Sequence, residues 1–175
     1  QTKDPKIALS LARSGILPFF ILTCVVVYLW GKNIGGENFG LAALAIFSFT
    51  PTILAISGVA TTDMALCSTV TTSVYIYWRW LLKRSLGLTV LLGIFVGLSI
   101  LSKLSAIIFL PVALLALYVG NRFVTRSDLT TKERKAPVVH HWVSAAIVIF
   151  LIVWSGYRFS FESINIHIPE SMLSL

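Results

Sequence analysis

Two charged residues stand inside otherwise apolar stretches, and they are the first candidates for chemistry. Asp63 follows the polar pair Thr61-Thr62 and precedes an apolar run, and Lys103 interrupts another run forty positions later. A carboxylate in such a place can orient a sugar, a metal or an acceptor. An ammonium group can hold a phosphate, with Ser102 and Ser105 as neighbouring donors. We therefore take Asp63 and Lys103 as candidate site residues.

Each of the two residues also has a purely structural explanation. Thr or Asp before an apolar run caps a helix by accepting hydrogen bonds from its first N–H groups, and a carboxylate suits the positive end of the helix dipole. A lysine at the tip of a helical hairpin can extend its ammonium group to water while its stem stays in lipid. The pattern alone leaves these alternatives open.

The composition determines the surroundings of these residues. The chain is 57% hydrophobic and only 12% charged, whereas soluble domains carry about 25% charged residues. A helix needs roughly 20 apolar residues to cross a membrane, and lipid offers the backbone no hydrogen bonds, so spanning segments are helices or closed barrels. The runs are too long for barrel strands and do not alternate. We therefore predict an all-α, polytopic transmembrane bundle rather than a soluble domain.

Six apolar blocks supply the expected membrane segments. Between the first two blocks, Gly31–Asn38 is rich in turn formers and predicts a loop. Thr50-Pro51 predicts a break or kink near the end of the second block. The blocks comprise residues 14–30, 39–56, 64–82, 86–101, 104–120 and 142–156.

The fourth and fifth blocks are expected to form a short helical hairpin with Lys103 near its tip. Each arm has about 16 residues, or roughly 24 Å of helix, so the tip should lie slightly below the membrane surface. The competing interpretation is one long tilted helix with Lys103 at mid-depth. A lysine at that depth costs about 2.5–3.5 kcal/mol, which favours the hairpin.

The charge distribution predicts the orientation. The net charge of +7 would suggest nucleic acid for a soluble protein, but here the cations lie in short connections, and no nucleic-acid partner is expected. The connections with Lys32, with Arg79 to Arg84 and with residues 122–135 are the most basic set, which the positive-inside rule places in the cytoplasm. Asp63, Lys103, Arg13 and Arg158 then share the extracytoplasmic face, although the N-terminal cations, Lys3, Lys6 and Arg13, count against this orientation.

The adjacent histidines do not predict a metal site. His140 and His141 point to different faces of a helix, so they should lie at the cytoplasmic interface instead.

Two segments carry a resemblance to a known family. One is Thr61-Thr62-Asp63-Met64-Ala65-Leu66, after an apolar helix that ends near a proline. The other is the hairpin Gly97-Leu98 to Lys103-Leu104-Ser105-Ala106, closed by Leu110-Pro111. Together they resemble the polyprenyl-phosphate-sugar-dependent glycosyltransferases with the GT-C fold, the group of protein O-mannosyltransferases and aminoarabinose transferases. The start at Arg13-Ser14 and the exit at Trp154–Tyr157 fit the same order.

The resemblance implies a multi-pass enzyme of the plasma or inner membrane. Such enzymes transfer a sugar from a polyprenyl-phosphate carrier to an acceptor protein or glycolipid on the extracytoplasmic face. Asp63 matches the family's second acidic residue and would be the catalytic base. Lys103, together with Arg13 and Arg158, would bind the phosphate of the lipid carrier.

The resemblance also implies a missing part. The family's principal catalytic carboxylate lies in a loop before the helix that begins here at Ser14, so we expect residues 1–175 to be one transmembrane region of a longer domain, inactive alone. The resemblance implies no certain cofactor, and a divalent metal stays open.

Two other classes of function compete with the enzyme. A transporter or flippase would place charged residues or broken helices at mid-membrane and often shows an inverted repeat, and the sequence has neither. A non-catalytic polytopic membrane subunit would use Asp63 only as a helix cap.

Overall fold

The computed structural model describes residues 14–59, 61–125 and 138–156. These residues form seven helices and no strand, which confirms the expected all-α class. The helices are α2 (Leu17–Gly35), α3 (Glu37–Phe49), α4 (Pro51–Ser57), α5 (Asp63–Leu82), α6 (Leu86–Ser102), α7 (Ala106–Thr125) and α8 (Val138–Gly156).

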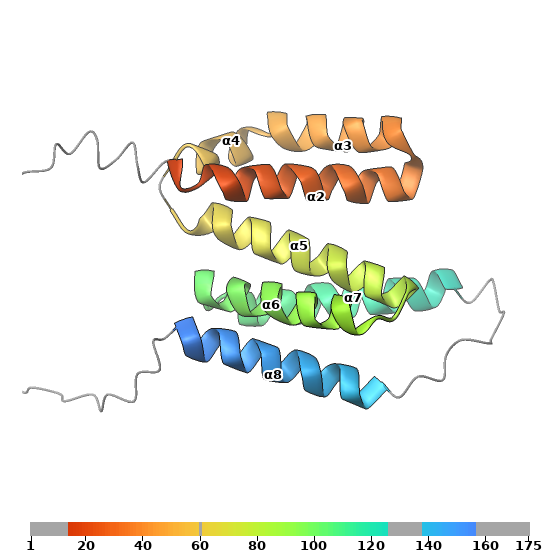
Figure 1. Cartoon of the computed structure of the whole chain (residues 1–175). Helices are drawn as coiled ribbons and strands as arrows, with labels where there is room; N and C mark the ends of the chain where they lie inside the picture. The colour runs from red at the N-terminus through yellow and green to blue at the C-terminus, as the bar shows by residue number, and fades with distance from the viewer. Residues whose placement is uncertain (1–13, 60, 126–137, 157–175) are drawn as a thin grey trace, which may run out of the picture.

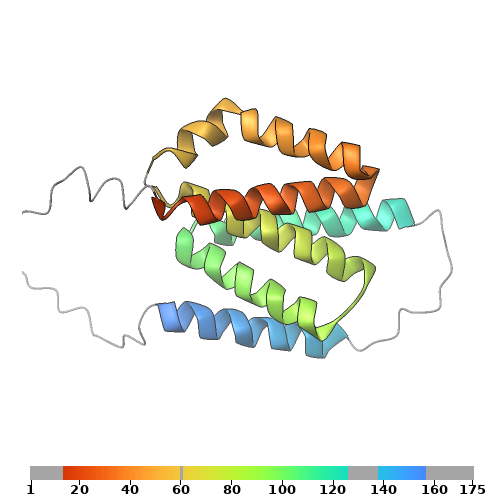
Figure 2. The same cartoon turned by 45° about the horizontal axis from the view of Figure 1, so that its top comes forward.

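The long helices lie alongside one another, with α5 in the middle. Helix α5 lies between α2 and α6, while α3 lies outside α2 and α8 outside α6 (Figure 1). Helices α2, α5 and α7 run in one direction and α3, α6 and α8 in the other (Figures 1 and 2). Two ends result. The Asp63 end holds residues 14–17, 61–63, 102–106 and 156, and the Arg84 end holds residues 35–37, 82–86 and 138–141.

The connection between α2 and α3 differs from the predicted loop over Gly31–Asn38. Helix α2 continues to Gly35, and only Gly36 leaves the helical conformation, with a φ of 84° that favours glycine. A Cβ atom on Gly31 would lie 3.0 Å from the Cα atom of Gly40. The prediction was wrong because these glycines let two helix backbones approach, which the turn-forming composition concealed.

The predicted break at Thr50-Pro51 is confirmed. Thr50 is extended, with φ −65° and ψ 121°, as is usual before proline. Pro51 begins α4, where its missing N–H group costs no helix hydrogen bond. The axes of α3 and α4 differ by 63°, and α4 leads the chain back to α5 at the Asp63 end (Figure 1).

Helix α5 buries hydroxyl groups at the centre of the bundle. Ser68, Thr69, Thr72 and Ser73 are all buried. Thr72 donates to the carbonyl oxygen of Ser68 at 2.7 Å, and Ser73 donates to that of Thr69 at 2.8 Å. The hydroxyls of Thr69, Thr72 and Ser73 are thus satisfied inside their own helix, whereas the buried Ser68 hydroxyl has no hydrogen-bond partner among the described residues. The small side chains of these residues allow neighbouring helices to come close.

The predicted hairpin between α6 and α7 is also confirmed. Helix α6 ends at Ser102 and α7 begins at Ala106, so Lys103 lies at the tip and the single long helix is excluded. Helix α6 packs chiefly against α5 and α8. Its contact with α8 is close, because a Cβ atom on Gly97 would lie 2.9 Å from Cγ2 of Ile152.

Helix length and apolarity support fewer membrane segments than the six expected. By these criteria α2 could cross a membrane, and so could the bent pair α3–α4 if it counts as one segment. Helix α6 has 17 residues, about 26 Å at the usual helical rise. Helix α5 has 20 residues, but its hydroxyl groups and Arg79 reduce its apolarity.

The close contact between α6 and α8 leads to a stability prediction. Gly97→Val should destabilise the protein by about 1–3 kcal/mol, because the new side chain must displace Ile152. Gly87→Val is the matched control in the same helix, since the nearest atom to a Cβ there is the Ser85 hydroxyl at 3.8 Å. Thermal unfolding in detergent measures both variants. Equal stability of the two variants would contradict the packing described here.

Candidate functional site

Asp63 and Lys103 form an ion pair at the Asp63 end. The Nζ atom of Lys103 donates a hydrogen bond to Oδ1 of Asp63 at 2.7 Å, across forty positions of sequence. Asp63 is the first residue of α5, and Lys103 directly follows the last residue of α6. Because α5 and α6 are antiparallel neighbours, the start of one meets the end of the other.

The structure does not support capping as the sole role of Asp63. Thr62 occupies the N-cap position of α5 and makes no side-chain capping hydrogen bond. The Asp63 carboxylate instead accepts its hydrogen bond from Lys103. A carboxylate in the first helical turn still interacts favourably with the helix dipole. Asp63 therefore supports the helix start electrostatically while its oxygens face another helix.

Both partners of the pair remain accessible. The side chain of Lys103 is 50% exposed and that of Asp63 is 43% exposed. An ion pair this exposed contributes about 0.2–1 kcal/mol, so it opens at little cost. The ammonium group has three N–H donors and the carboxylate has two oxygens. The mutual bond occupies one donor and one oxygen, which leaves further bonding capacity on each group.

The sequence predicts that Ser102 and Ser105 donate hydrogen bonds to a phosphate beside Lys103, and the structure does not support this for Ser102. The hydroxyl of Ser102 donates to the carbonyl oxygen of Leu98 at 2.8 Å, so its proton is used within α6. The carbonyl oxygen of Ser105 accepts from the N–H group of Ile108 and begins the turn into α7. In this geometry Ser102 is not a donor to a ligand.

The other predicted site residues, Arg13 and Arg158, lie outside the described residues. Their nearest described neighbours are Ser14 and Gly156, which both lie at the Asp63 end (Figure 2). Within residues 14–59, 61–125 and 138–156, no group of three or more His, Cys, Asp or Glu side chains could hold a metal ion. The roles predicted for Arg13 and Arg158 stay predictions.

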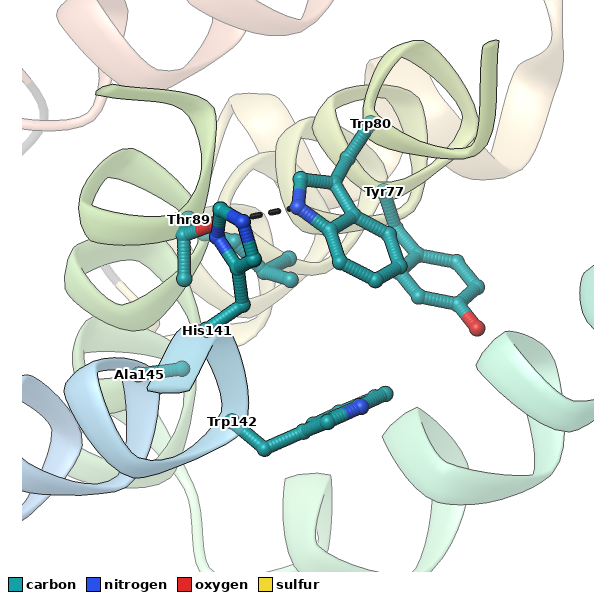
Figure 3. A pocket seen from close by; sticks show the side chains of 7 residues that line it. Tyr77, Trp80, Thr89, His141, Trp142 and Ala145 are labelled. Atoms are coloured by element: carbon teal, nitrogen blue, oxygen red, sulfur yellow. Dashed lines mark hydrogen bonds between the residues drawn. The ribbon is translucent and has the colours of Figure 1, made fainter. Parts of the chain in front are cut away.

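A second polar cluster, which sequence reasoning missed, lies at the Arg84 end (Figure 3). The indole N–H of Trp80 donates to Oγ1 of Thr89 at 3.0 Å, and that oxygen also lies 2.9 Å from Nδ1 of His141. The Thr89 hydroxyl donates its one proton to the carbonyl oxygen of Ser85 at 3.0 Å. His141 must then donate through Nδ1–H. The sequence singles out His141 but gives no sign that it meets Thr89, which lies 52 positions away.

Two hollows lie away from the ion pair. A void of about 10 Å³ lies within the second cluster, between Tyr77, Trp80 and Trp142 (Figure 3). A groove of about 370 Å³ runs between α5 and α7, lined by Trp78, Ala113, Ala116, Leu117, Gly120 and Asn121. Asp63 and Lys103 line neither, so the candidate site is an open surface at the end of the helices.

Comparison with known proteins supplies the identity of the fold family. No curated protein and no solved structure matches the chain. The dolichyl-phosphate-mannose-protein mannosyltransferase family matches residues 13–157, a range that contains Asp63 and Lys103. This match covers most of the chain and confirms the resemblance drawn from the Asp63 and Lys103 segments. The chain belongs to the dolichyl-phosphate-mannose-protein mannosyltransferase family, whose members are membrane-embedded glycosyltransferases.

Proposed function

We propose that the protein transfers a sugar from a polyprenyl-phosphate carrier to an acceptor hydroxyl, and that Asp63 and Lys103 form part of its site. The family supports glycosyl transfer in a membrane. The observation that carries the finer proposal is the 2.7 Å contact between Lys103 and Asp63. A base for an acceptor and a cation for a carrier phosphate are the two groups that this reaction needs, and here they are adjacent.

Lys103 acts on the phosphate of the donor. As the bond between the sugar's anomeric carbon and the phosphate oxygen breaks, its electron pair leaves with the phosphate. A nearby ammonium group stabilises the negative charge that develops there. In the free protein the same ammonium group binds the carboxylate of Asp63. The donor phosphate therefore competes with Asp63 for Lys103, and the low energy of a half-exposed pair makes this exchange easy.

Asp63 acts on the acceptor. Once the donor phosphate holds Lys103, the carboxylate accepts the proton of the acceptor hydroxyl as its oxygen bonds to the anomeric carbon. The new glycosidic bond replaces the bond to phosphate, and the proton ends on Asp63. Arrival of the donor thus prepares the base.

The surface of the helices supports a membrane location with several segments. Large apolar side chains point outward, among them Phe49 at 79% exposure, Ile46 at 72% and Ile108 at 69%. Such a surface suits lipid and not water. Short helices such as α6 then cross a locally thinner bilayer or tilt little. The cations of the Arg84 end favour the cytoplasm, which directs the Asp63 end to the extracytoplasmic face, the face that the sequence also predicts for Arg13 and Arg158.

The α3–α4 bend bears on the transporter alternative. Broken helices are common in transporters, where they lie near mid-membrane around the transported substrate. The bend of 63° here precedes α4, which lies beside the start of α5 at the Asp63 end. Since α3 has 13 residues and α4 has 7, the break lies part-way along the bundle and nearer the Asp63 end. It brings α4 against the start of α5, which fits support of a surface site better than the lining of a central passage.

The role of Asp63 leads to a prediction about turnover. Asp63→Asn in the intact protein should lower the rate of sugar transfer about 100-fold or more, because an amide cannot accept the acceptor's proton. Sugar transfer from a labelled polyprenyl-phosphate donor in isolated membranes measures this rate. Glu37→Gln is the matched control, a carboxylate lost at the other end of the bundle. Unchanged turnover in Asp63→Asn would remove Asp63 from the chemistry.

The role of Lys103 leads to a prediction about the donor. Lys103→Met should raise the apparent KM for the donor about tenfold, the effect of losing one charge-assisted hydrogen bond. Thermal stability should change by less than about 1 kcal/mol, because the lost ion pair is half exposed. Lys32→Met is the control for loss of a lysine elsewhere. An unaltered donor KM would leave Lys103 with only a structural role.

Cysteine labelling tests the proposed orientation of the protein in the membrane. Thr61→Cys and Lys83→Cys are made separately in a protein whose Cys24 and Cys67 are replaced by alanine. A membrane-impermeant maleimide added outside intact cells should label position 61 and not position 83. The reverse pattern would invert the orientation and place the ion pair at the cytoplasmic face.

A further inference from the structure

Arg84, in the turn between α5 and α6, holds an unusual position for a surface cation. The carbon of its guanidinium group lies 5.3 Å from the centre of the Trp80 ring. Its NH1 nitrogen is buried and has no hydrogen-bond partner among the described residues. A buried N–H group without an acceptor costs free energy, and an unseen water or ion is one of the explanations for such a group in a native protein. An acceptor from outside the described residues would remove this cost after a small movement of the Arg84 side chain.

The surface under Arg84 is fixed by several contacts. Trp80 is only 5% exposed, and its indole N–H bonds to Thr89 at 3.0 Å. The Tyr77 ring stacks at 5.9 Å from that of Trp80, and the His141 and Trp142 rings contact it edge-on at 6.0 and 5.8 Å (Figure 3). A guanidinium group on a rigid aromatic face loses little freedom when it binds an anion. The Trp80 face is therefore a prepared platform for Arg84.

The charge around Arg84 favours an anion. Glu37 is the only carboxylate among the described residues of that end. The guanidinium of Arg79 donates to the Tyr75 hydroxyl at 3.2 Å, so a neutral group and not a carboxylate holds this neighbour. Uncompensated cations create a positive potential that attracts anionic ligands. The described cations toward this end are Lys32, Arg79, Lys83 and Arg84.

Apolar side chains on both sides of Arg84 indicate what kind of anion binds. Leu82 and Leu86 flank the turn and are 63% and 56% exposed. A cation between exposed leucines matches the level where lipid headgroups meet acyl chains. A soluble anion would gain nothing from the leucines, whereas a phospholipid would contact them with its chains.

We propose that Arg84, on its Trp80 platform, binds the phosphate of an anionic phospholipid in the leaflet at the Arg84 end. The planar guanidinium group can donate two parallel hydrogen bonds to phosphate oxygens. Basic sites between membrane helices bind anionic headgroups in this way. The site lies at the end of the bundle opposite the Asp63–Lys103 pair, and it requires only that the protein be embedded in a membrane.

The test compares lipid retention by the intact protein in detergent. Phosphatidylglycerol and phosphatidylcholine with matched chains are added, and the bound lipid is counted by native mass spectrometry. The wild-type protein should retain more phosphatidylglycerol than phosphatidylcholine. Arg84→Gln should reduce phosphatidylglycerol retention about tenfold, the loss of one charge-assisted contact. Arg79→Gln removes the same charge at the same end and should reduce retention less than about threefold.

Further measurements distinguish a phospholipid from a soluble anion and the planar guanidinium group from a simple positive charge. Inorganic phosphate alone should not raise the Tm, and an increase equal to that from phosphatidylglycerol would show a soluble anion and overturn the lipid proposal. Arg84→Lys keeps the charge but not the planar fork, so it should lose retention severalfold even if Arg84→Gln does not fold. Equal retention of the two lipids by the wild-type protein, full retention by Arg84→Lys, or equal losses in Arg84→Gln and Arg79→Gln would each overturn the proposal. Sugar transfer is not measured, so the result is independent of the proposed function.

Discussion

The antiparallel packing of α5 against α6 is the constraint on which both ends of the molecule depend. The two helices are joined by residues 83–85, so packing along their length brings Asp63 back to Lys103. A buried cluster of Ile76, Tyr77, Trp80 and Leu92 holds them together near the turn. In a membrane such side chains hold the helices together by close packing contacts along both helices, whereas the half-exposed ion pair contributes about 1 kcal/mol or less. The core therefore positions the charges, and the charges do not hold the core. Such a pair can be opened by a ligand without loss of the fold.

Much of this arrangement follows from the sequence because its interruptions have local causes. Proline at position 51 cannot continue α3, and a lysine at position 103 is too costly at mid-membrane, so both breaks were predicted where they occur. Alternation of the apolar blocks then put Asp63 and Lys103 at one end. The 2.7 Å contact itself was beyond prediction, because it depends on the rotation of each helix about its axis. The roles proposed for the two residues rest on the family and on this contact.

Other features could not be predicted from the sequence, for physical reasons. Gly31 belongs to a segment with the composition of a loop but lies against Gly40 where two helices meet. Thr89 and His141 are 52 positions apart, and no local pattern links residues on different helices. Helix α5 satisfies three of its buried hydroxyl groups, those of Thr69, Thr72 and Ser73, with its own carbonyl oxygens, which a hydropathy scale does not register.

The central claim is that Asp63 and Lys103 meet for chemistry and not for stability, and a charge swap tests it directly. Asp63→Lys combined with Lys103→Asp keeps an ion pair at the same place but exchanges the base and the phosphate-binding cation. Sugar transfer from a polyprenyl-phosphate donor and thermal stability are measured on the same membrane preparations. The account predicts a stability within about 1 kcal/mol of wild type and no measurable transfer. Wild-type transfer by the swapped protein would contradict it.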